Sequence, residues 1–303
     1  QAQYARLSSE IDQAMKEVLL QGDFIQGSAV KQLESALSER YQVKNVISCA
    51  NGTDALQLAF MALDLPKGSE IITPAFSYAA LAEVLLLLEL KPVFVEVDPA
   101  TFLMDVSLVE AMITGNTRAI APVHLYGQMV SMEPLLALAK KHNLYVVEDA
   151  AQAIGSQYCT PGEHGFAGTM GHIGTTSFFP SKNLGCFGDG GAIFTNDDDL
   201  AQRLRSMANH GQTVKYQHDI LGLNSRLDTL QAAVLMAKLP HLHDFEKSRR
   251  AVAARYDEAL GSLDGLEIPD RTVDSSHVFH QYTMTCKTAA MRDGLKMYLA
   301  EHE

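Results

Sequence analysis

The sequence predicts an α/β fold, in which a mostly parallel sheet with helices on both faces is followed by a smaller C-terminal α+β domain. Between residues 45 and 150, short β-rich runs alternate with helical stretches, which is typical of parallel sheets. These apolar runs lack strict alternation, as expected of strands buried on both faces. A chain of 303 residues is long enough for two domains.

Hydrophobic periodicity gives the order of the first elements. Leu7, Ile11 and Met15 fall on one face of a helix, and Leu33 and Leu37 continue the pattern, so two helices are expected in the first 40 residues. The strands that follow are expected at 45–48, 70–73, 92–97, 118–123 and 144–148, with helices near 53–64, 78–89, 107–113 and 131–142.

The pattern changes after Ala150. Residues 155–175 are rich in glycine and are expected to form a long loop. The later strands are predicted at 175–179, 191–195 and 278–285, and the later helices at 197–209, 228–260 (with a break at Pro240) and 289–300. We therefore predict a large domain over 1–240 and a small domain over 241–303 that is incomplete at Glu303.

Composition excludes several classes of protein. Lysine and arginine total 24 and aspartate and glutamate total 36, so the net charge is −12, and neither nucleic acid nor an anionic membrane is expected as the main partner. The longest apolar run is too short to span a bilayer, and no signal-peptide pattern is recognisable. The four cysteines lack the spacing of a zinc site or a disulfide framework. A cytoplasmic protein without a metal is therefore expected.

Common catalytic and binding motifs are missing from the sequence. It has no Gly-x-Gly-x-x-Gly fingerprint, no P-loop, no His-Glu-x-x-His and no Gly-x-Ser-x-Gly. The candidate chemistry lies instead in four segments, each of which follows a predicted strand.

The first two segments could bind a phosphate and a flat ring. Gly52 and Thr53 open a helix after a strand, where free N–H groups bind phosphate, although this segment alone is better explained by Thr53 as a plain helix cap. Tyr78 follows the next strand and could stack on a heteroaromatic ring, although taken alone it is better explained by core packing.

The other two segments supply an acid and a lysine. Glu148 and Asp149 end a buried apolar strand, where acids are costly unless they are paired, and Asp149 could hold a protonated ring nitrogen or merely cap a helix. Lys182 follows an apolar strand and precedes a glycine-rich run, and a desolvated lysine becomes a nucleophile for carbonyl groups. A lysine, an acid, a phosphate turn and a stacking group together match the needs of pyridoxal 5′-phosphate.

Several segments carry a resemblance to a known family. They are Asn51–Leu56, Glu148–Gln152, Ser177–Lys182, Asn209–Gly211, Gly222–Asp228, Gln231–Ala233 and His280–Thr283. These segments resemble the DegT-type nucleotide-sugar aminotransferases, which are fold-type I pyridoxal-phosphate enzymes. The resemblance extends over nearly the whole chain, and its lysine motif is highly specific.

The resemblance implies roles around the cofactor ring. Lys182 is expected to form the Schiff base and to shuttle the proton, and Asp149 is expected to hold the pyridinium nitrogen. Gln152 is expected to approach the ring oxygen, and Tyr78 to stack on the ring. Lys182 and Asp149 are therefore the predicted catalytic residues.

The resemblance also implies a phosphate site and a shared interface. Gly52, Thr53 and Ser177 are expected to bind the cofactor phosphate. Asn224 is expected to reach the phosphate in the neighbouring subunit, and Arg226 to contact substrate across the interface. The family thus implies a homodimer whose active sites are built from both subunits.

The activity implied is transamination from L-glutamate to a keto group of a nucleotide-linked sugar, in the biosynthesis of cell-surface polysaccharides or deoxyamino sugars. The residues around Lys182 and in the segment 122–128 most resemble the branch that aminates C3. Within that branch they most resemble enzymes acting on UDP-linked 3-keto uronic acids. The branch that aminates C4 more often has histidine in place of Phe179.

Two alternatives share this fold. One is a pyridoxal-phosphate nucleotide-sugar dehydratase, against which Lys182 argues because known dehydratases of this kind carry a histidine there. The other is a non-catalytic regulator, which the joint presence of the lysine, the acid and the phosphate turn disfavours.

Overall fold

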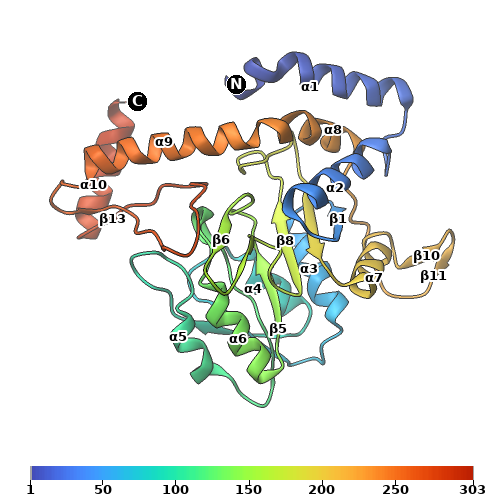
Figure 1. The fold of residues 1–303 in the computed structure, drawn as a ribbon, viewed down its shortest axis with the longest axis horizontal. Coiled ribbons are helices and arrows are strands. Elements are labelled where there is room, and N and C mark those ends of the chain that lie inside the picture. The colour runs from blue at the N-terminus through green and yellow to red at the C-terminus, as the bar shows by residue number, and fades with distance from the viewer. Residues whose placement is uncertain (1, 303) are drawn as a thin grey trace.

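A seven-stranded sheet forms the centre of the computed structural model, which describes residues 2–302 (Figure 1). Its spatial order is β1-β9-β8-β5-β4-β2-β3. Only β9 runs against the other six strands, since it pairs antiparallel with both β1 and β8. The strands are β1 (Asn45–Cys49), β2 (Glu70–Pro74), β3 (Lys91–Val95), β4 (Thr117–Ile120), β5 (Tyr145–Asp149), β8 (Ile173–Ser177) and β9 (Gly191–Thr195). The mostly parallel sheet predicted from the sequence is confirmed.

Ten α-helices and three short 3₁₀ turns surround the sheet within the described residues. The helices are α1 (Ala2–Gln21), α2 (Ser28–Tyr41), α3 (Gly52–Leu63), α4 (Ala80–Leu87), α5 (Val106–Val109), α6 (Met132–His142), α7 (Asp198–Ala208), α8 (Thr229–Lys238), α9 (Leu242–Leu260) and α10 (Ala289–His302). The 3₁₀ turns are η1 (Glu110–Met112), η2 (Leu125–Gly127) and η3 (Leu239–His241). Pro240 lies in η3 between α8 and α9, where the break was predicted.

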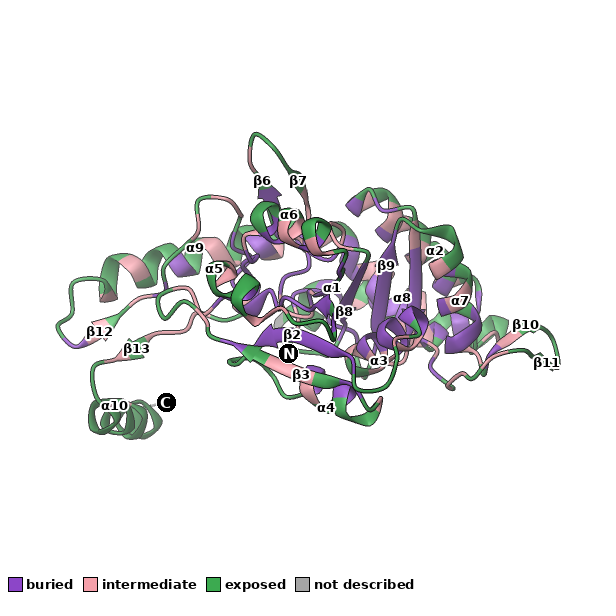
Figure 2. Ribbon diagram, turned by 90° about the horizontal axis from the view of Figure 1, so that it is seen from below, coloured by how far each residue is buried: buried purple, intermediate pink, exposed green. Residues whose placement is uncertain are grey.

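The helices cover both faces of the sheet. In β9, Ile193 packs into the hydrophobic cluster that contains α3, whereas Ala192 and Phe194 pack into the cluster that contains α2 and α8. Successive side chains of a strand point to opposite faces, so these two clusters lie on opposite sides of the sheet. Figure 2 shows the consequence: the central strands are buried between helices whose outer surfaces are exposed.

The direction of the strands brings the predicted site together. β1, β2, β5 and β8 run the same way, so Cys49, Pro74, Asp149 and Ser177 end at one edge of the sheet. All four segments singled out from the sequence follow these strand ends. In α/β sheets, ligands bind outside the carboxyl ends of the strands.

The long loop predicted over 155–175 is wrong in part. It contains a hairpin of two short strands, β6 (Gln157–Cys159) and β7 (His164–Phe166). Each strand has only three residues, and the glycines between and beside them hide the alternation that marks a strand. The short hairpin β10 (Gln212–Val214) and β11 (Gln217–His218) was missed because its strands are too short to show an alternation.

The strand predicted over 278–285 is also wrong. Only β13 (Thr285–Cys286) is a strand, paired with β12 (Leu266–Glu267). The apolar residues Val278 and Phe279 instead pack against η2, where the Val278 N–H donates to the Gly127 carbonyl at 2.8 Å. Phe279 has a φ of 47°, which an extended strand does not allow.

The helices of residues 2–302 are each too short or too polar to span a lipid bilayer. The helix predicted over 107–113 forms only the single turn α5 followed by η1. The boundary between a large domain over 1–240 and a small domain over 241–303 stays a prediction.

Candidate active site

The turn between β1 and α3 forms a corner with the end of β8. Asn51 caps α3, and its side-chain oxygen accepts the N–H of Asp54 at 2.8 Å. That cap leaves the N–H groups of Gly52 and Thr53 without a partner among the described residues, as is usual in a first helical turn. Ser177 packs directly against Gly52, so its hydroxyl faces the same corner.

Gly52 is required by this close approach. A Cβ atom at residue 52 would lie 2.7 Å from the Ser177 Cβ, closer than real contacts permit. Gly52→Ala should therefore separate the two segments and weaken phosphate binding about 10- to 100-fold, because a hydrogen bond to a charged group contributes about 1.5–3 kcal/mol. Titration of the chain with pyridoxal phosphate measures this affinity. Gly115→Ala is the matched control, since a Cβ at residue 115 meets no atom within 4 Å; equal affinities for the two variants would contradict the assignment.

Lys182 lies in a loop that folds back onto the end of β8. Its N–H donates to the Phe179 carbonyl at 2.8 Å, and the Cys186 N–H donates to the Phe178 carbonyl at 2.8 Å. From the other side, the buried Lys238 of α8 donates its Nζ to the Gly185 carbonyl at 2.6 Å. The backbone around Lys182 is therefore fixed while its own side chain makes no hydrogen bond or ion pair with the described residues.

The Lys182 amine and the Asp149 carboxylate act on each other electrostatically. Burial lowers the pKa of Lys182, and the negative charge of Asp149 opposes that shift. Burial raises the pKa of Asp149, and the hydrogen bond from the Ala151 N–H and the charge of Lys182 oppose it. A lowered pKa populates the neutral amine, the form that attacks aldehydes, at lower pH than in an exposed lysine.

Tyr78 and Gln152 lie at the same edge of the sheet. Tyr78 is in the turn between β2 and α4, outside the helix predicted to begin there, and 75% of its surface is exposed. Core packing is therefore excluded for Tyr78. The Gln152 side-chain oxygen accepts the N–H of Tyr126 in η2 at 2.7 Å, so the amide has one fixed orientation.

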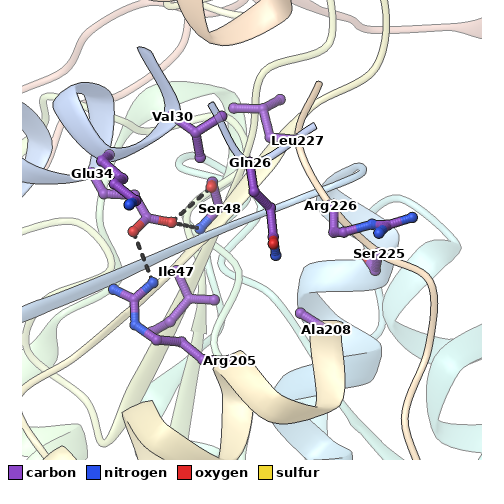
Figure 3. A pocket seen from close by; sticks show the side chains of 11 residues that line it. Gln26, Val30, Glu34, Ile47, Ser48, Arg205, Ala208, Ser225, Arg226 and Leu227 are labelled. Atoms are coloured by element: carbon purple, nitrogen blue, oxygen red, sulfur yellow. Dashed lines mark hydrogen bonds and ion pairs between the residues drawn. The ribbon is translucent and has the colours of Figure 1, made fainter. Parts of the chain in front are cut away.

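Asn224 and Arg226 are not joined to Lys182 or Asp149 by any hydrogen bond or ion pair of the described residues. Ser225 between them accepts the Ala50 N–H at 3.2 Å, which holds this segment beside the turn that precedes Gly52. Arg226 lines a cavity of about 320 Å³ opposite Glu34 and Arg205. In Figure 3, Glu34 bonds to Ser48 and Arg205 while the Arg226 side chain extends away from them.

Two residues at this edge were not predicted to matter for the site. The carboxylate of Glu148 accepts a hydrogen bond from His124 Nε2 at 2.8 Å, and both side chains are completely buried. The sequence signal was present, because two adjacent acids at the end of an apolar strand require a partner. The identity of that partner, which lies 24 residues away along the chain, could not be predicted from the sequence.

The model of the DegT/DnrJ/EryC1/StrS aminotransferase family matches residues 5–303. The chain belongs to this family. It is 47% identical to the UDP-2-acetamido-2-deoxy-3-oxo-D-glucuronate aminotransferase of Pseudomonas aeruginosa, over 93% of this chain and 77% of that protein. It is also 46% identical to a pleiotropic regulatory protein of Geobacillus stearothermophilus, over 99% of this chain and 79% of that protein.

Solved structures of the DegT/DnrJ/EryC1/StrS family share the fold. A crystal structure of DesV from S. venezuelae with a ketimine intermediate aligns with a TM-score of 0.94 at 39% identity, covering 99% of this chain and 79% of DesV. The predicted family and the fold-type I architecture are thereby confirmed. Aminotransferases of this family use pyridoxal phosphate, the cofactor expected from the four segments.

The residues of the chain fit this cofactor. The N–H groups of Gly52 and Thr53 and the Ser177 hydroxyl supply phosphate donors in a corner where a Cβ at residue 52 finds no room. Lys182 supplies an amine with a lowered pKa, and Asp149 supplies a carboxylate within electrostatic reach of it. One edge of the sheet therefore presents every type of group that pyridoxal phosphate requires.

Proposed function

We propose that this aminotransferase moves the amino group of L-glutamate to the C3 keto group of a nucleotide-linked sugar, with a UDP-linked 3-keto uronic acid as the nearest substrate class. The observation that carries the proposal is the placement of Lys182 and Asp149 beside the Gly52–Thr53 turn at one sheet edge. The name of the P. aeruginosa relative supports the position of the keto group and the uronic acid.

Each residue has a distinct part in this proposal. When bound, pyridoxal phosphate supplies an electron-withdrawing ring that stabilises negative charge at the carbon that loses its proton. Lys182 Nζ carries that proton between donor and acceptor atoms as a single base. The Asp149 carboxylate keeps the ring nitrogen protonated, and the Gly52 and Thr53 N–H groups with the Ser177 hydroxyl hold the phosphate. Gln152 and Tyr78 orient the ring from its edge and its face.

We further propose that the enzyme is a homodimer in which Asn224 and Arg226 serve the partner's site. Neither residue forms a hydrogen bond or ion pair with Lys182 or Asp149 among the described residues, and Arg226 extends away from the Glu34–Arg205 pair. Exposed apolar side chains occur close by in sequence, where Leu221 is 81% exposed, and Ile25, 51% exposed, pairs with Asp228. Exposed apolar surface of this kind is typical of subunit interfaces.

A mixed dimer tests the shared site. A chain with Asn224→Ala and Arg226→Ala, and a chain with Lys182→Ala, should each be inactive alone. Co-expressed, they should recover roughly a quarter of wild-type turnover, because half of the dimers are mixed and each holds one intact site. Turnover of the co-purified mixture that equals only the sum of the separate variants would refute sites built from two subunits.

A substrate screen tests the reaction itself. ¹⁵N-labelled L-glutamate is incubated with UDP- and dTDP-linked 3-keto and 4-keto sugars, and the products are read by mass. The proposal expects a labelled amino sugar from a 3-keto substrate and an equal amount of 2-oxoglutarate. Products from 4-keto sugars alone would move the reaction to C4, and no labelled product from any sugar would overturn the proposal.

A regulatory role is the second candidate, because the G. stearothermophilus relative is named a pleiotropic regulatory protein. Lys182, Asp149 and the Gly52 corner are all present in this chain, and a protein without catalysis has no need of that set. Glutamate-dependent formation of 2-oxoglutarate separates the two candidates directly.

A further inference from the structure

Glu148 is a completely buried carboxylate with an unusually full set of donors. Besides His124 Nε2 at 2.8 Å, it accepts the N–H groups of Gly168 at 3.0 Å, Met170 at 2.7 Å and Gly171 at 2.5 Å. Burying a carboxylate costs several kcal/mol, and these four hydrogen bonds offset that cost. The acid at residue 148 therefore holds His124 on one side and the backbone of Gly168, Met170 and Gly171 on the other.

His124 is fixed at both ring nitrogens. Its Nδ1 lies 3.2 Å from the backbone N–H of Val130, which must donate, so Nδ1 is the acceptor. The proton of the neutral ring is then on Nε2, where it is donated to Glu148. The two bonds leave the buried imidazole one position and one tautomer.

The backbone of His124 is bonded to Asp149, the residue that follows Glu148 in β5. Its N–H donates to the Asp149 carbonyl at 3.0 Å, and the Asp149 N–H donates to the Pro122 carbonyl at 2.9 Å. β4 ends at Ile120, so these bonds are what hold Asp149 on the β4 side, while β8 holds it through Thr175 on the other. His124 thus binds Glu148 with its side chain and Asp149 with its backbone.

We propose that His124, anchored by Glu148, is a positioning residue that fixes the Asp149 carboxylate at the end of β5. The inference rests on the proposed function of Asp149 at the cofactor ring. The same segment continues into η2, where the Tyr126 N–H fixes the Gln152 amide at 2.7 Å. A shift of residues 122–126 would therefore displace two of the proposed ring contacts together.

Two substitutions at residue 124 test the two hydrogen bonds of the imidazole ring one at a time. His124→Asn keeps an acceptor for the Val130 N–H but loses the link to Glu148, whereas His124→Gln keeps a donor that reaches Glu148. His172→Asn is the matched control, because His172 Nδ1 likewise accepts a backbone N–H, that of Val146 in β5 at 3.0 Å, and asparagine keeps an acceptor there. Each chain is compared by pyridoxal phosphate affinity, by the absorbance of the bound cofactor, and by kcat and KM.

His124→Asn should alter the cofactor absorbance and lower kcat about 10- to 100-fold with little change in KM, as expected when a reacting group is misplaced by about 1 Å. His124→Gln should regain most of the loss, and His172→Asn should match the wild type. A wild-type spectrum and kcat for His124→Asn would overturn the proposal.

If His124→Asn does not fold, Glu148→Gln is the second test of the proposal. It keeps the side-chain volume and removes the charged acceptor of the His124–Glu148 hydrogen bond. The same spectral change and loss of kcat support the proposal, whereas wild-type values, or a chain that unfolds as well, assign the pair to stability alone and overturn it. A wild-type enzyme without turnover on any keto sugar would refute the proposed function. The cofactor spectra would still decide the role of His124.

Discussion

Lys182→Ala should abolish the absorbance of the covalently bound cofactor and lower turnover by at least about 10²- to 10⁴-fold, the range ascribed to a positioned proton-transfer group. The Lys182 side chain makes no hydrogen bond or ion pair with the described residues, so its removal should leave the fold intact. The amine is half-buried with a lowered pKa, which makes it the nucleophile in this account. Absorbance and turnover of the purified variant measure both effects.

Lys67→Ala is the control for that substitution. Lys67 is an exposed lysine paired with Glu89, and it precedes β2 at the sheet edge opposite the proposed site, so its loss should change neither absorbance nor turnover. A Lys182→Ala chain that still forms a covalent cofactor adduct and turns over at the wild-type rate would remove Lys182 from the mechanism.

Asp149→Asn should leave folding unchanged and lower turnover about 10²- to 10³-fold, the usual effect of removing one preorganised electrostatic partner. The asparagine oxygen can still accept the Ala151 N–H that Asp149 Oδ1 now accepts at 3.0 Å. What is lost is the negative charge that keeps the cofactor ring nitrogen protonated. Steady-state turnover with glutamate and thermal unfolding of the same sample separate the two effects.

Asp197→Asn provides the same chemical change at a distance. Asp197 caps α7, where its side chain accepts the N–H groups of Asp199 and Leu200, and asparagine caps helices equally well. Its turnover should equal that of the wild type. Near-normal turnover of Asp149→Asn would show that the acid has no electronic role.

The sequence was sufficient to predict the edge of the sheet at which the site lies. Gly52, Asp149 and Lys182 each follow an apolar run, and parallel strands bring their carboxyl ends together whatever the details of the loops. The lysine, the acid and the phosphate turn are therefore predicted to share one edge of the sheet from the sequence alone.

The contacts within the site depend on residues that local patterns do not connect. Glu148 accepts hydrogen bonds from His124 and from the N–H groups of Gly168, Met170 and Gly171, which belong to segments far apart in the sequence. Every non-proline residue has a backbone N–H group, so the sequence does not show which of these groups bind Glu148. The β6–β7 hairpin and the irregular packing of Val278 on η2 were missed because short or strained segments lack a hydrophobic period.

The covalent link between Lys182 and the cofactor is the central claim. The wild-type chain is loaded with pyridoxal phosphate, reduced with borohydride, digested, and its peptides are analysed by mass. The account predicts one modified peptide, with the phosphopyridoxyl group on Lys182. Modification of a different lysine, or none after full loading, would contradict it.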